Sequence, residues 1–96
     1  MPDPHRKFED AIKENYGCSS HWLRSITVAV DLGNQLRWRD VVQVFALHDY
    51  VKAEIAYAWT YRSRGEDKVV TVLGIPPIDS AQAAVKSVIG DPAGGN

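Results

Sequence analysis

The chain has 96 residues, of which 45% are hydrophobic and 24% are charged, a composition that supplies one hydrophobic core and is too short for two. Eleven Lys and Arg against twelve Asp and Glu leave a formal net charge of −1, which excludes attraction of nucleic acid or anionic lipid through a global positive field. We predict a single domain over residues 1–90 and a loose tail at 91–96.

The first predicted element is an amphipathic helix over residues 3–16. Its apolar positions recur at helical spacing, at Phe8, Ala11, Ile12 and Tyr16. Asp3-Pro4 supplies an N-cap acceptor and a first-turn proline. Gly17 follows as a residue suited to the left-handed position that ends a helix.

Two strands joined by a tight turn are expected next. Residues 26–32 alternate between apolar and polar or small side chains, the period of a strand. Gly33-Asn34 supplies the positive-φ residues of a hairpin turn, and residues 36–47 form a second β-rich run. That run has apolar side chains at odd and even positions, so we expect both of its faces to be partly covered.

The segment from Val51 to Tyr61 is interpreted as a third strand. Its odd positions hold six apolar residues in succession, which a helix would scatter around its circumference. Its alanine and glutamate content keeps a helix open as an alternative.

A polar turn at residues 63–67 leads to a fourth predicted strand over residues 68–75, which Pro76-Pro77 ends. Asp79 or Ser80 then caps a second helix. The apolar stripe of this helix consists of Ala81, Ala84, Val85, Val88 and Ile89.

The predicted fold is therefore α+β, with the order α-β-β-β-β-α, a four-stranded antiparallel meander sheet and both helices packed on one face. In a meander the turns alternate between the two ends of the sheet. The turns at 33–34 and 63–67 should share one end, and the turn at His48-Asp49 should lie at the other.

This geometry groups Cys18 and His21 with His48 and Asp49. All four are residue types that bind metals or carry proton and thiol chemistry. The Cys18-x-x-His21 spacing suits zinc, with His48 and Asp49 completing four ligands, although a zinc signature normally has two spaced pairs. A Cys-His nucleophilic pair oriented by Asp49 is a further reading.

Each of these residues also has an ordinary structural explanation. Cys18 fits a small buried hydrophobe, His21 a residue at the entry to a strand, and Asp49 a turn former. We therefore expect no cofactor and regard the four as candidate metal or thiol residues, not as an assigned site.

A second group, at the opposite end of the sheet, is aromatic and basic. It consists of Trp38, Trp59 and Tyr61 with Arg37, Arg39, Arg62 and Arg64. Aromatic rings beside arginines form platforms for single-stranded nucleic acid. Nearby acidic residues offset this charge, and aromatics at strand spacing also fill cores.

The sequence thus favours a non-enzymatic interaction domain that binds a protein partner or self-associates through the sheet. The valine-rich fourth strand is the edge that we expect to be more open. Single-stranded nucleic-acid binding is the alternative, and a metal or thiol site comes third. The lone Cys18, the lack of a secretory leader in MPDPHRKFED and the lack of a long apolar run predict a cytoplasmic protein without membrane contact.

Overall fold

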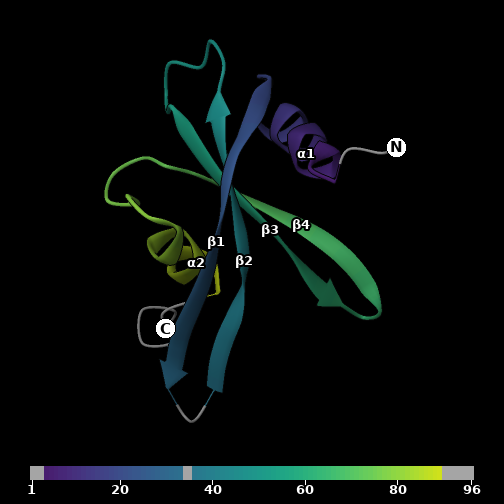
Figure 1. The fold of residues 1–96 in the computed structure, drawn as a ribbon, viewed down its shortest axis with the longest axis vertical. Helices are drawn as coiled ribbons and strands as arrows, with labels where there is room; N and C mark the ends of the chain where they lie inside the picture. Colours follow the sequence, from purple (N-terminus) through teal and green to yellow (C-terminus); the bar gives the residue numbers. More distant parts are fainter. Residues whose placement is uncertain (1–3, 34–35, 90–96) are drawn as a thin grey trace.

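A computed structural model describes residues 4–33 and 36–89 of the chain (Figure 1). Its elements are α1 (Arg6–Tyr16), β1 (Ser20–Gly33), β2 (Leu36–Leu47), β3 (Ile55–Ser63), β4 (Glu66–Leu73) and α2 (Ala81–Ile89). This order confirms the predicted α+β arrangement. Asn34 of the predicted turn and the predicted tail at 91–96 lie outside the described residues.

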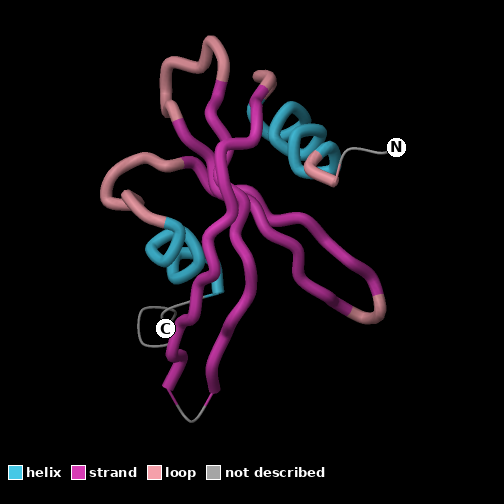
Figure 2. Tube along the Cα trace, in the orientation of Figure 1, coloured by secondary structure: helices cyan, strands magenta, loops and turns pink. Residues whose placement is uncertain are grey.

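The four strands form one antiparallel sheet in the order β1-β2-β3-β4. β1 pairs with β2 from Ser20↔Leu47 to Gly33↔Leu36, and β3 pairs with β4 along the length of both strands. Between the two hairpins, β2 and β3 pair over residues 43–46 and 55–58 alone. Figure 2 shows the consequence, because the hairpins diverge from this shared centre as two separate arms.

The strand predictions hold with changed boundaries. β2 has the predicted bounds, and the third segment is a strand and not a helix. β3 begins at Ile55, and the chain before it forms a loop in which Val51 is 99% exposed and Ala53 is buried. β4 is also shifted, to Glu66–Leu73, because Arg64 and Gly65 alone turn the chain, each with positive φ.

β1 is longer than predicted because it begins at Ser20, six residues before the predicted strand over 26–32. Its register shifts between Trp22 and Arg24. Trp22 pairs with Phe45, whereas Arg24 pairs with Val44, so even-numbered residues before and after the shift face opposite sides of the sheet. This bulge breaks the alternation from which strands are recognised.

The two helices pack on opposite faces of the sheet, so the prediction of a single covered face was wrong. α2 packs with Val42 and Val44 of β2, and with Tyr57 and Trp59 of β3. The cluster that contains Phe8 and Ile12 of α1 includes the alternate positions Phe45, Ala56 and Ala58. Successive side chains of a strand point to opposite faces, so these two clusters lie on either side of the sheet, as Figure 1 shows for α1 and α2.

We call these the α1 face and the α2 face. The sequence signal for this arrangement is that β2 has apolar residues at both odd and even positions, because a strand covered on both faces needs apolar side chains on both faces. Ala56 and Ala58 are fully buried, and their small side chains let α1 lie close to β3.

The helix termini follow local chemistry. α1 begins at Arg6 with His5 at the N-cap position, which makes no side-chain capping bond, while the predicted cap Asp3 lies outside the described residues. Gly17 ends α1 as predicted, with φ 76° and its N–H donating to the Lys13 carbonyl at 2.8 Å. Ser80 caps α2, since its Oγ accepts a hydrogen bond from the Ala83 N–H at 3.1 Å.

The buried position of Ala58 gives a test of the two-faced core. We expect Ala58→Leu to lower the free energy of unfolding by about 1–3 kcal/mol, because the added methylenes have no space beneath α1. Arg62→Leu, on the same face and strand but with an exposed side chain, is the matched control and should change stability by less than about 1 kcal/mol. Urea denaturation of both variants measures the difference, and a tolerated leucine at Ala58 would contradict the placement of α1.

Candidate functional site

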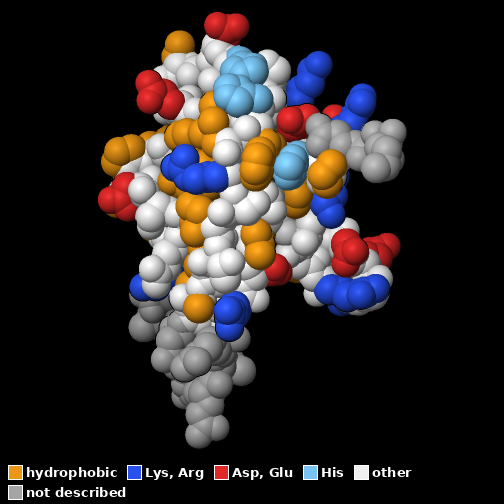
Figure 3. Space-filling model, in the orientation of Figure 1, with side chains coloured by type: hydrophobic (Ala, Val, Ile, Leu, Met, Phe, Trp, Pro, Cys, Tyr) orange, Lys and Arg blue, Asp and Glu red, His pale blue; other side chains and the backbone are white. Residues whose placement is uncertain are grey.

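The first candidate group is brought together in part. His21, on β1, and His48, directly after β2, form what we call the histidine pair: His21 Nδ1 and His48 Nε2 lie 2.6 Å apart. The second ring nitrogen of His48, Nδ1, lies 3.0 Å from Ser19 Oγ. Both imidazoles are exposed, and histidine side chains gather near the end of the molecule at which β1 begins (Figure 3).

Cys18 and Asp49 do not complete this group. Cys18 is buried in the cluster with Phe8, Ile12 and Phe45 on the α1 face. Asp49 is exposed and occupies a positive-φ turn position. Among the described residues, no group of three or more His, Cys, Asp or Glu side chains is placed to hold a metal ion. The described residues therefore do not form the four-ligand zinc set, and the buried Cys18 is not part of the exposed histidine pair.

The aromatic residues of the second group lie on the α2 face but are not equally accessible. Trp59 is 1% exposed and meets Trp38 edge to face, with ring centroids 6.1 Å apart. Tyr61 is 43% exposed. Trp38, Trp59 and Tyr61 line a largely apolar pocket of about 310 Å³ together with Val70 and Val88. Trp59 is therefore a core residue, and Tyr61 belongs to the surface.

The basic residues of this group do not join the aromatics on one surface. Arg39 and Arg62 occupy strand positions that point to the α1 face, opposite to the aromatic rings. Arg62 also lies 3.9 Å from Asp67. Arg64 is exposed in the β3–β4 turn. The side chain of Arg37 lies outside the described part of the structure.

The outer edge of β1 is a surface that the sequence did not single out. The His48 N–H donates to the Ser19 carbonyl, and the Leu47 N–H donates to the Glu54 carbonyl on the opposite side. Backbone groups of an antiparallel strand alternate in this way along its length. The backbone N–H and C=O groups of even-numbered β2 residues therefore point toward β1, and those of odd-numbered residues point away from it.

One further hydrogen bond agrees with this alternation. The Val41 N–H bonds to Asp40 Oδ1 at 2.7 Å, beyond the point at which β3 leaves β2. Ser25, Thr27 and Ala29 of β1 stand opposite odd-numbered β2 residues. Their own N–H and C=O groups consequently point outward, and no described strand pairs with that edge.

Apolar side chains flank this edge at the bulge. Trp22 is 39% exposed and Leu23 is 36% exposed. The Trp22 ring stacks on His5 with centroids 4.6 Å apart, and its Nε1 donates to Gln43 Oε1 at 2.8 Å. These contacts hold the indole in one orientation while leaving much of its surface accessible to a partner.

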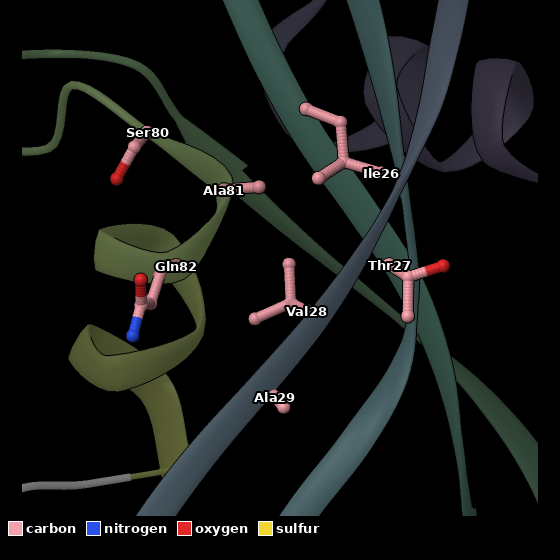
Figure 4. A pocket seen from close by; sticks show the side chains of 7 residues that line it. All are labelled: Ile26, Thr27, Val28, Ala29, Ser80, Ala81 and Gln82. Atoms are coloured by element: carbon pink, nitrogen blue, oxygen red, sulfur yellow. The ribbon is translucent and has the colours of Figure 1, made fainter.

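A pocket of about 270 Å³ follows the same edge. It is lined by residues 26–29 of β1 and by residues 80–82 at the start of α2. In Figure 4 the Ile26 and Val28 side chains point toward α2, whereas Thr27 points away from it. The outward backbone groups of Thr27 and Ala29 therefore lie beside a hollow between a strand edge and a helix.

Tyr57 is the described titratable group with a clearly shifted pKa. Burial raises the pKa of its phenol above 10.0, the negative charge of Asp79 raises it further, and Arg24 acts in the opposite direction. The hydroxyl thus stays protonated at neutral pH, which suits a core residue and not a general base.

Comparison with known proteins gives no match to a family model, a curated protein or a solved structure. Among the described residues, no helix has the length and apolar character needed to cross a membrane.

The different exposure of the tryptophans can be measured by acrylamide quenching. We expect Trp22→Phe to remove most of the quenchable fluorescence, because Trp22 is exposed, Trp38 is half-buried and Trp59 is buried. Trp38→Phe is the matched control and should leave the quenchable fraction largely unchanged. Strong quenching in a Trp22→Phe, Trp38→Phe double variant would contradict the core position of Trp59.

Proposed function

We propose that this protein is a non-enzymatic interaction domain that adds an extended segment, from a protein partner or from a second copy, to the outer edge of β1. The observation that supports this best is the row of outward backbone groups at Ser25, Thr27 and Ala29. An added strand would satisfy these groups with the hydrogen bonds of a continued sheet.

Features beside the edge supply what backbone pairing lacks. Backbone hydrogen bonds are independent of sequence, so specificity in strand addition comes from side-chain contacts. Trp22 and Leu23 offer apolar contact area at one end. The hollow between residues 26–29 and the start of α2 offers a place for a side chain of the added segment.

β1 suits this role better than β4, the edge favoured from the sequence. β1 has 14 residues and β4 has eight. α1 packs over β4, where Asn15 and Tyr16 both hydrogen-bond to Thr71. The longer strand presents more consecutive backbone groups to a partner.

The single-stranded nucleic-acid alternative has less support. A stacking platform needs accessible rings beside basic side chains. Trp59 is buried, and Arg39 and Arg62 lie on the other face of the sheet. The thiol alternative is weakened because Cys18 lies in the core of the α1 face.

Amide hydrogen exchange tests the edge directly. At low protein concentration we expect the amides of Ser25, Thr27 and Ala29, which point outward, to exchange quickly. The amides of Ile26 and Val28 point toward β2 and should exchange slowly. If a second copy adds to β1, the fast amides become protected as concentration rises about a hundredfold and the mass by light scattering doubles. A constant monomeric mass would rule out self-association.

A proline scan separates backbone pairing from side-chain contact. Thr27→Pro removes an outward N–H that makes no bond within the sheet, and edge positions tolerate proline. We expect it to abolish self-association, or the binding of extended peptides selected from a displayed library. The matched control Thr27→Ala keeps the N–H and should bind normally. Equal binding by both variants would contradict strand addition at this edge.

A further inference from the structure

The histidine pair has a geometry that the proposed interaction does not use. His21 Nδ1 and His48 Nε2 face each other at 2.6 Å on the surface of the molecule. We propose that these two nitrogens bind one divalent transition-metal ion of the class that imidazole favours, namely Cu²⁺, Ni²⁺ or Zn²⁺. The inference is independent of strand addition at β1.

The contact with Ser19 prepares His48 for this role. His48 Nδ1 lies 3.0 Å from Ser19 Oγ. An N–H on Nδ1 that donates to the hydroxyl leaves the lone pair of Nε2 directed at His21, and metal-bound histidines commonly donate their other N–H to such an oxygen. In this tautomer and without metal, the lone pair accepts a hydrogen bond from an N–H on His21 Nδ1.

Metal binding requires a simple proton shift. In a neutral His21 ring the proton on Nδ1 moves to Nε2 by exchange with water. His21 Nδ1 and His48 Nε2 then both present lone pairs to the ion. No net proton is released from a neutral pair, and no oxidation or reduction takes place.

The spacing of the two nitrogens is close to that of two ligands on one ion. With metal–nitrogen bonds of about 2.0–2.1 Å, ligands at a right angle lie about 2.9 Å apart and tetrahedral ligands about 3.3 Å apart. For square or octahedral coordination the pair must therefore open by about 0.3 Å, and both rings must turn so that their lone pairs point at the ion and not at each other. The smaller change in spacing favours Cu²⁺ and Ni²⁺ geometry over the tetrahedral geometry of Zn²⁺.

The backbone holds both ligands in place. His21 pairs with Ala46 in the β1–β2 ladder, and the His48 N–H donates to the Ser19 carbonyl at 3.0 Å. The ion would therefore link the beginning of β1 to the end of β2 without a backbone rearrangement. No third His, Cys, Asp or Glu among the described residues joins the pair, so water fills the other coordination positions and the ion stays exchangeable.

Calorimetric titration of the whole chain with CuCl₂, NiCl₂ and ZnCl₂ tests the proposal. We expect one ion per chain, with affinity in the order Cu²⁺ above Ni²⁺ and Zn²⁺. The electron paramagnetic resonance spectrum of the Cu²⁺ form should show two coordinated imidazole nitrogens. Metal should also raise the unfolding temperature, because it binds the folded pair in preference to the unfolded chain.

Three variants locate the ion. His21→Gln and His48→Gln should each remove the one-site binding curve and the thermal shift, and His5→Gln, which removes an imidazole outside the pair, should keep both. Ser19→Ala should weaken binding by about 10- to 100-fold, the usual cost of losing a group that orients a metal ligand. Far-ultraviolet circular dichroism confirms that each variant is folded.

Several results would overturn the proposal. Absence of binding in the wild-type chain, unchanged affinity in His21→Gln or His48→Gln, or loss of binding in His5→Gln would each show that the pair does not hold the ion. Unchanged affinity in Ser19→Ala would overturn the role assigned to that hydroxyl.

Discussion

The structure depends on the burial of both faces of β2. Val42 and Val44 pack toward α2, while Phe45 packs toward α1, and all three are almost fully buried. Because neighbouring residues of one strand supply two separate clusters, β2 lies between the hydrophobic clusters of the two faces. A chain of this size gains from this arrangement, since a single strand removes apolar surface from water on both sides.

Both candidate surfaces follow from how the sheet ends. β1 is an edge because no described strand pairs beyond it. At its bulge, Trp22 pairs with Phe45 on the α1 face, and after the bulge the even-numbered side chains of β1 lie on the α2 face. The histidine pair lies next to the bulge, at the end of the same β1–β2 ladder where backbone pairing extends to Ser19 and His48. Neither surface requires an active-site cleft.

Periodicity predicted the element types and their order because alternation and helical spacing are local properties of the chain. It placed His21 near His48 because a meander fixes which turns share an end. It placed both helices on one face, which was wrong, because a stripe of apolar residues shows that a face is covered without showing by which element. The bulge concealed the first part of β1, and Trp59 could be assigned to the core or to a platform until α2 was placed over its ring.

The terminal helices pack against strands that are distant in the sequence. α1, at the beginning of the chain, lies over β4, with Phe8 and Ile12 in the cluster that Val69 and Leu73 adjoin, and α2, at the end, lies over Val28 and Val30 of β1. During synthesis, β1 therefore leaves the ribosome long before the helix that covers it. Until α2 emerges, the valines of β1 have no helical cover, and this interval is when the chain is most exposed to aggregation or to a chaperone.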